Sequence, residues 1–197
     1  MKGRYVVVRD KRLMGGVPAH ANLSIINTDK TTPLRVVFHQ INACARAGRI
    51  NTLFVLCHGY AGANLRLNVS ADAGGMGLQL GKEGVMHANV NQWTHIKNNV
   101  DNIVVYACAA ADTEPGNEGS KADGRYLMGA LALITNADVY AADRIQWYQT
   151  YNGMKIGAYD FGTWEGNVYK FPANSGQGAI VAGPPVELTM VLAGRAP

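Results

Sequence analysis

Charged side chains are scarce in this sequence of 197 residues: they make up 16% of it, compared with roughly 25% in typical soluble domains. Hydrophobic residues make up 48%, and this combination excludes an intrinsically disordered chain, which requires low hydrophobicity and high charge. The 18 basic and 14 acidic residues are scattered and form no Lys/Arg block, so we expect no nucleic acid and no membrane as partners. The length suits one compact domain that spans residues 1–197.

Long apolar runs and cysteines are also few. No stretch reaches the roughly 18 apolar residues that a membrane span needs, and the run at 5–8 is too short for the core of a signal peptide. The three cysteines are widely spaced, which favours free thiols in a reducing compartment over a disulfide framework. We therefore expect a protein that is cytoplasmic, or exported by a route without a signal peptide.

Strand-like and helix-like patterns alternate along most of the chain. Two runs, 53–57 and 103–108, are apolar nearly throughout, as expected for strands that are buried on both faces. Further strands are predicted at 5–8, 22–26 and 139–142, and helices from Pro33 to a stop at Gly48, at 89–100 and at 120–135, the last with Tyr126 facing the core. This alternation predicts an α/β fold, a three-layer sandwich with a mainly parallel central sheet.

The end of the chain, 173–197, is poor in charge and rich in Gly, Ala and Pro. The pattern is compatible with a strand followed by a loosely ordered end, and equally with a tail that binds a partner. The sequence leaves both alternatives open.

Two residues that can take part in catalysis stand at the ends of the two buried runs. His58 follows the first run and Cys108 ends the second, and ligands of open α/β sheets sit beyond the carboxyl ends of the strands. Their separation, 108 − 58 = 50 residues, leaves room for a crossover between neighbouring strands. An imidazole beside a thiol can take its proton, and the thiolate then attacks a carbonyl carbon. We predict that His58 is the general acid and base and that Cys108 is the nucleophile.

Further expectations concern Gly59, beside His58, and the three cysteines. Gly59 has no side chain, so a substrate carbonyl can approach its backbone, and the N–H groups of Gly59 and Cys108 are the predicted oxyanion hole. Cys57 and Cys44 are predicted to pack in the core. An activated Cys108 is expected to have a low pKa and to react with iodoacetamide before the other two thiols at about pH 6 to 7.

The motifs Phe54-Val55-Leu56-Cys57-His58-Gly59 and Val105-Tyr106-Ala107-Cys108 resemble those of the caspase-like cysteine peptidases, the clan of caspases, legumain, clostripain, gingipains and separase. The resemblance is strongest to bacterial caspase-like domains. It continues through the Leu78-Gln79-Leu80-Gly81 hairpin to Asp143, and so covers 52–145. The spacing of about 50 residues from His to Cys is also that of caspases. Caspases themselves carry Gln-Ala-Cys-Arg-Gly at the nucleophile, whereas this chain has Tyr106-Ala107-Cys108-Ala109-Ala110, which argues against a caspase proper.

The resemblance implies a caspase-like fold and a cysteine endopeptidase that forms a thioester acyl-enzyme with a polypeptide substrate and needs no metal or other cofactor. In this fold the strand after the nucleophile's helix walls the pocket for the residue before the scissile bond. Ala142 and Asp143 would then line this pocket, where the small alanine leaves room and the carboxylate favours Arg, and then Lys. The alternative is that Asp143 caps a turn or pairs with Arg144.

Two other classes of function share parts of these motifs. A non-catalytic interaction module that retains the caspase-like fold would keep the same motifs. The stretch His58-Gly59-Tyr60-Ala61-Gly62 also resembles the oxyanion loop of α/β-hydrolases, but the sequence has no Gly-x-Ser-x-Gly elbow. The remaining histidines, at 20, 39, 87 and 95, have no metal-ligand spacing with a cysteine or a carboxylate, so we expect no metal site.

Overall fold

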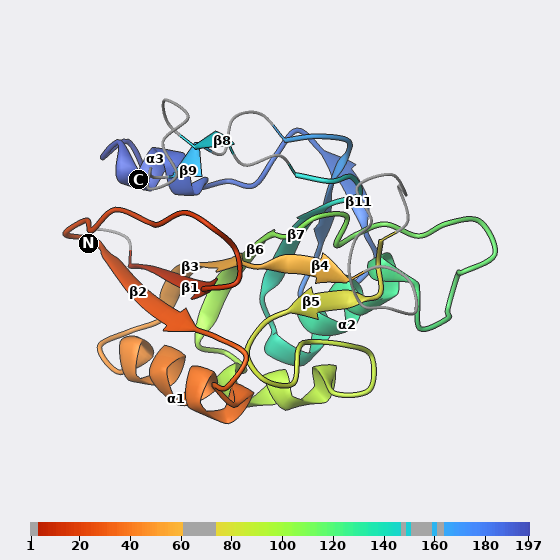
Figure 1. The fold of residues 1–197 in the computed structure, drawn as a ribbon, viewed down its shortest axis with the longest axis horizontal. Helices are drawn as coiled ribbons and strands as arrows, with labels where there is room; N and C mark the ends of the chain where they lie inside the picture. Colours follow the sequence, from red (N-terminus) through yellow and green to blue (C-terminus); the bar gives the residue numbers. More distant parts are fainter. Residues whose placement is uncertain (1–3, 61–73, 147–148, 151–158, 161–163) are drawn as a thin grey trace.

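The computed structural model describes residues 4–60, 74–146, 149–150, 159–160 and 164–197. Its five parallel strands are β1 (Tyr5–Asp10), β2 (Leu23–Thr28), β3 (Ile50–Leu56), β6 (Val100–Tyr106) and β7 (Asp138–Ala142). Two antiparallel strands, β10 (Val168–Phe171) and β11 (Ala179–Val181), extend the sheet beyond β7. The order across the sheet is β11-β10-β7-β6-β3-β1-β2 (Figure 1).

Two short hairpins lie outside the central sheet. One pairs β4 (His58–Tyr60) with β5 (Gly77–Gln79), and the other pairs β8 (Gln149–Thr150) with β9 (Tyr159–Asp160). Because β4 begins two residues after β3 ends, the first hairpin stands directly at the carboxyl edge of the sheet.

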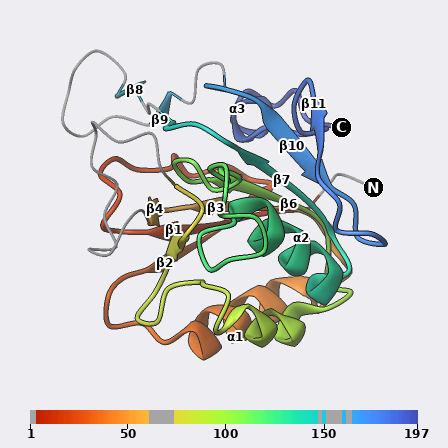
Figure 2. The ribbon, with the colours of Figure 1, turned by 90° about the vertical axis from the view of Figure 1, so that its right-hand side faces the viewer.

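Helices cover the two faces of the sheet unequally. The helices α1 (Leu34–Ala45) and α2 (Gly124–Thr135) and the 3₁₀ helix η1 (Val90–Ile96) pack on one face, and the short α3 (Leu188–Leu192) packs on the other (Figure 2). Alternate residues of each strand point to opposite faces of the sheet. In β1, Val6 and Val8 pack on the side of α1, α2 and η1, whereas Tyr5 and Val7 pack on the side of α3. The fold is therefore α/β with a mostly parallel central sheet, an arrangement compatible with a three-layer sandwich.

Three local expectations are wrong. The segment 89–100 is not one helix, because η1 ends at Ile96, Asn98 takes a left-handed conformation with φ of 65°, and Val100 already belongs to β6. Pro33 precedes α1 with an extended backbone instead of occupying its first helical position. Tyr126 is 59% exposed, because α2 turns Leu127 and Leu131 toward the sheet and leaves the tyrosine ring stacked on His87.

Residues 173–197 contribute to both the sheet and its second face. The strand β11 pairs with β10, and α3 buries Leu188 and Val191 against the sheet. The Tyr5 hydroxyl donates a hydrogen bond of 2.7 Å to the carbonyl of Pro197, which joins the last residue to the first strand. Within the described residues, no helix has both the length and the apolar character to cross a bilayer.

Candidate functional site

The ends of β3 and β6 bring His58 and Cys108 to the same edge of the sheet. These strands are adjacent and parallel, and their last paired residues are Leu56 and Tyr106. His58 and Cys108 each stand two residues beyond that pair. The two residues therefore follow adjacent strands at the same distance along the chain, His58 at the start of β4 and Cys108 in a turn. The fold thus brings both predicted residues to one edge of the sheet, where the His58 ring contacts the Arg12 carbonyl and the Cys108 thiol contacts the Gln146 carbonyl.

His58 has a fixed partner on the segment that follows β1. Its Nε2 lies 3.2 Å from the backbone carbonyl oxygen of Arg12. A carbonyl only accepts hydrogen bonds, so Nε2 carries the proton and Nδ1 of the neutral ring is left as the acceptor. In this tautomer Nδ1 is the ring nitrogen that can accept a proton.

The amide of Gly59 is directed away from its hairpin partner. Leu78, the residue opposite Gly59, uses both its N–H and its carbonyl in hydrogen bonds of 2.9 Å with Val85 on its other edge. In an antiparallel pair this makes Gly59 and Leu78 a non-hydrogen-bonded pair, so the N–H of Gly59 points outward from the β4–β5 hairpin. This orientation suits the predicted role of Gly59 as an oxyanion donor.

Cys108 lies in a turn that backbone contacts hold in place. The N–H groups of Ala109 and Ala111 donate to the carbonyls of Arg144 and Ala142, at 2.7 and 2.9 Å. On the other side Gly74 approaches so closely that a Cβ there would lie 2.3 Å from the Cβ of Ala109. The turn that presents the thiol is thus packed between the end of β7 and the segment before β5.

The surroundings of the Cys108 thiol favour its protonated form. It is partly buried, and its Sγ donates a hydrogen bond of 3.6 Å to the carbonyl of Gln146. Burial raises the pKa of the Cys108 thiol, and the nearby hydrogen bonds only partly oppose this. The expectation of a low pKa is therefore wrong for the substrate-free protein, because desolvation disfavours the thiolate. Cys57 is fully buried in the core, which raises its pKa as well, and Cys44 packs partly buried against the same core.

Alkylation should reveal the raised pKa of Cys108. A raised pKa means a smaller thiolate fraction at every pH below it, and iodoacetamide reacts with the thiolate. We expect native Cys108 to react more slowly at about pH 7 than the same residue in the urea-unfolded chain, and its rate to go on rising above about pH 9. Mass spectrometry of the alkylated peptides separates the three thiols. A rate that levels off below about pH 8 contradicts the prediction.

Gln146 connects Cys108 with the segment 164–167. Its side chain is buried, its Nε2 donates to the carbonyl of Glu165 at 2.8 Å, and its Oε1 accepts from the N–H of the same residue at 3.3 Å. Trp164 stacks on Tyr106 at the end of β6, with ring centroids 4.7 Å apart. Segment 164–167 therefore forms one wall beside the candidate nucleophile.

Asp143 and Ala142, the predicted pocket residues, close β7 next to this wall. Ala142 is fully buried and pairs with Val168 of β10. Asp143 is 9% exposed, and its carboxylate accepts hydrogen bonds of 2.8 and 3.1 Å from the backbone and side-chain nitrogens of Asn167. The carboxylate thus anchors segment 164–167. Each of its oxygens keeps a second lone pair for a further donor.

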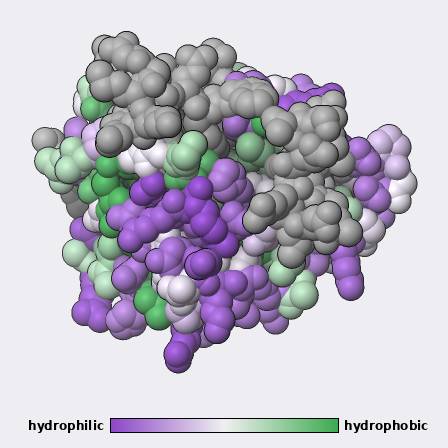
Figure 3. Space-filling view, in the orientation of Figure 1, coloured by the Kyte–Doolittle hydropathy of each residue, from purple (hydrophilic) through white to green (hydrophobic). Residues whose placement is uncertain are grey.

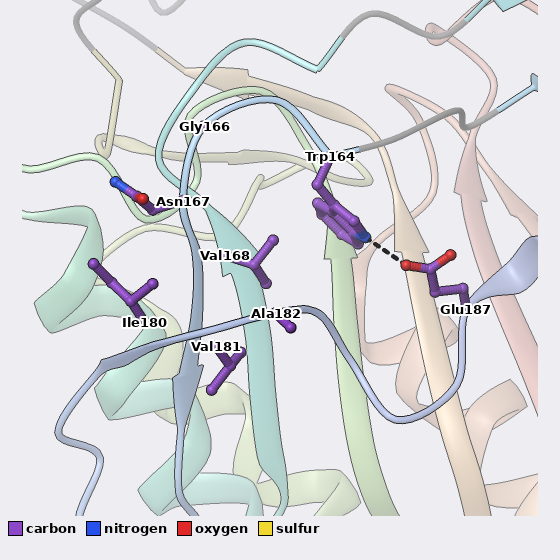
Figure 4. A pocket seen from close by; sticks show the side chains of 8 residues that line it. All are labelled: Trp164, Gly166, Asn167, Val168, Ile180, Val181, Ala182 and Glu187. Atoms are coloured by element: carbon purple, nitrogen blue, oxygen red, sulfur yellow. Dashed lines mark hydrogen bonds between the residues drawn. The ribbon is translucent and has the colours of Figure 1, made fainter.

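A cavity of about 340 Å³ is lined by the same segment and by residues of β10 and β11 (Figure 4). The indole Nε1 of Trp164 donates a hydrogen bond of 3.0 Å to Glu187 at its rim. Eight residues line it: Trp164, Gly166, Asn167, Val168, Ile180, Val181, Ala182 and Glu187. The cavity therefore adjoins the wall segment but does not include His58 or Cys108.

Asp10 and Arg12 also belong to this edge of the sheet, although the sequence reading did not single them out. Asp10 is the last residue of β1 and is fully buried, and it forms a salt bridge of 2.6 Å with Nη2 of Arg12. The signal that could have identified them is the one used for His58: polar residues at the carboxyl end of a buried strand. The middle of the face seen in Figure 3 is mainly hydrophilic.

Comparison with known proteins leaves the family open: no protein-family model and no curated protein matches the sequence. In the part of the chain that the structure describes, no three His, Cys, Asp or Glu side chains gather closely enough to hold a metal ion.

Proposed function

We propose that the protein is a cysteine endopeptidase with a caspase-like fold, in which His58 and Cys108 form the catalytic dyad. The observation that carries this proposal is their equivalent placement: each follows a buried parallel strand by two residues, and the strands are adjacent. The orientation of His58 by the carbonyl of Arg12 adds to it, since a nucleophile, a base and a third group that orients the base is the arrangement of nucleophilic catalysis.

The reaction follows from the atoms at the site. The Cys108 proton moves to Nδ1 of His58 while Sγ bonds to the scissile carbonyl carbon, and the N–H groups of Gly59 and Cys108 donate to the resulting oxyanion. The carbon–nitrogen bond then breaks, and the imidazolium gives its proton to the departing amine. Water, deprotonated by His58, hydrolyses the thioester and restores the thiol.

Because the pKa of Cys108 is raised, His58 has to act as a general base that removes the thiol proton during the attack. A thiol that is mostly protonated at neutral pH attacks only if its proton leaves in the same step, so the dyad works by general-base catalysis and not from a resting ion pair. A substrate that displaces the hydrogen bond from Cys108 to the Gln146 carbonyl would free the thiol for this transfer.

An electrophilic peptide tests the proposal directly. We expect a peptidyl chloromethyl ketone to add one equivalent of probe to the protein, and peptide mapping to find it on Cys108, since the reagent alkylates an activated thiol. The control is iodoacetamide of equal concentration, which carries no peptide and should not show the same preference. Absence of an adduct, or an adduct distributed over Cys44 and Cys108 alike, contradicts a catalytic thiol.

The residue before the scissile bond is proposed to be Arg, with Lys next. Asp143 stands between Ala142 and Arg144, whose carbonyls accept hydrogen bonds from the turn that carries Cys108, and among the described residues its carboxylate bonds only to Asn167. Reporter peptides that differ only at that residue should be cleaved fastest after Arg. Asp143→Ala should then reduce cleavage after Arg by about 10- to 100-fold and leave cleavage after Ala nearly unchanged. An equal loss on all substrates would mean that Asp143 acts only by anchoring Asn167.

A non-catalytic interaction module with the same fold is the second candidate. The observation that favours it is the thiol itself, since a raised pKa and a hydrogen bond to a carbonyl also suit a cysteine that only fills space. The electrophilic peptide distinguishes the two candidates, because a module without catalysis gives no selective adduct.

A further inference from the structure

We propose that the Asp10–Arg12 pair is a positioning device that holds His58 in one tautomer and one orientation. Arg12 is a positioning residue in this proposal, since its side chain acts on the ring through its own backbone carbonyl and through β5. The kinetic part of the inference rests on the proposed peptidase function, whereas the tautomer does not.

Asp10 anchors the segment that carries the acceptor for His58. Its carboxylate accepts three hydrogen bonds from Arg12: from the backbone N–H at 3.0 Å, from Nε at 2.8 Å and from Nη2 at 2.6 Å. It accepts a fourth, at 2.9 Å, from the N–H of Gly81. A fully buried carboxylate with four donors leaves Arg12 little freedom, because moving it would strand a buried charge.

The guanidinium of Arg12 also contacts β5 and the residues after it, in the hairpin that contains His58. Nη2 also donates to the carbonyl of Gly81 at 2.7 Å and to that of Gln79 at 3.3 Å. Gln79 is the β5 residue that pairs with His58. The backbone of His58 and the acceptor of its ring are therefore both held by one side chain.

This arrangement decides which ring nitrogen is basic. A carbonyl fixed 3.2 Å from Nε2 stabilises the tautomer with the proton on Nε2 and leaves the lone pair on Nδ1. With a mobile carbonyl, the neutral ring would divide between both tautomers, and the fraction protonated at Nδ1 could not accept the thiol proton. Lysine cannot replace Arg12, because a single ammonium lacks the planar fork that grips a carboxylate at two points.

Nitrogen NMR of the histidine rings measures the tautomer without any substrate. Protein labelled with ¹⁵N-histidine is compared at about pH 8.5, where an ordinary imidazole is neutral, and His58→Gln assigns the His58 signals. We expect the wild type to show His58 protonated at Nε2, and Arg12→Lys and Asp10→Asn to show a mixture of tautomers. The matched control is Arg49→Lys, which alters an Arg–Asp pair of 2.8 Å with Asp101 near the amino ends of β3 and β6.

Steady-state kinetics supplies the second readout. Arg12→Lys should lower kcat by about 10- to 100-fold with KM within about twofold, since a misplaced base slows the chemical step without loosening the substrate. Circular dichroism and urea unfolding identify the variants that remain folded, and Asp10→Asn, which keeps the shape of the side chain, serves if Arg12→Lys unfolds. A single Nε2–H tautomer in a folded variant overturns the positioning role. If the tautomer changes as expected but no peptide is cleaved by any form, the peptidase proposal fails and the positioning inference stands.

Discussion

Replacing Cys108 with alanine is expected to abolish both labelling by the electrophilic peptide and proteolysis, with a loss of at least about 10³-fold in kcat. The methyl group cannot form the thioester. Cys57 also stands at this edge of the sheet but is fully buried in the core, and Cys44 lies in α1, so neither thiol can replace Cys108. His58→Ala should have a loss of similar size, because the raised pKa of Cys108 leaves the thiol dependent on a base.

The double variant separates a dyad from two independent contributions. When two residues act as one unit, removing both costs little more than removing either, so Cys108→Ala combined with His58→Ala should be barely worse than each single variant. Cys44→Ala is the control, because it removes a thiol outside the site and should retain full activity. Proteolysis within tenfold of the wild type in either single variant, with unchanged circular dichroism, would rule out the dyad.

Replacing Asp10 with alanine is expected to lower the free energy of unfolding by about 3 kcal/mol. The change removes the acceptor of four hydrogen bonds. It leaves the guanidinium of Arg12 without its counter-charge, held only by the carbonyls of Gln79 and Gly81, and the N–H of Gly81 without its acceptor. The Arg12 side chain is 26% exposed and can partly turn toward water, which keeps the loss at the lower end of the range for broken buried pairs.

Urea unfolding measures this loss, and a surface pair provides the comparison. Asp101→Ala removes the partner of Arg49, and both of those side chains are nearly half exposed, so a change below about 1 kcal/mol is expected. A loss below about 1 kcal/mol for Asp10→Ala as well would show that the buried pair contributes no more than a surface pair. A cycle with Arg12→Ala then isolates the coupling between Asp10 and Arg12.

The placement of the candidate dyad was predictable because it depends on patterns within short stretches. An apolar run of strand length that stops at a polar residue indicates both a buried strand and its functional end, and β3 and β6 follow that rule. The same local reasoning failed at 89–100, where Trp93 and Ile96 are three residues apart, a spacing that the tighter 3₁₀ helix satisfies as well as an α-helix does.

The sequence by itself determined the five parallel strands of the sheet and the residues at the ends of β3 and β6, because these depend on hydrophobic periodicity along the chain. It did not predict the antiparallel strands β10 and β11. Only the tertiary structure decided what those residues touch. Arg12 meets His58 across 46 positions, and Gln146 meets Cys108 across 38. Such contacts depend on strand order and register, which no local pattern encodes. The pKa of Cys108 is likewise a tertiary property, since burial among distant segments, and not its own neighbours in the chain, disfavours the thiolate.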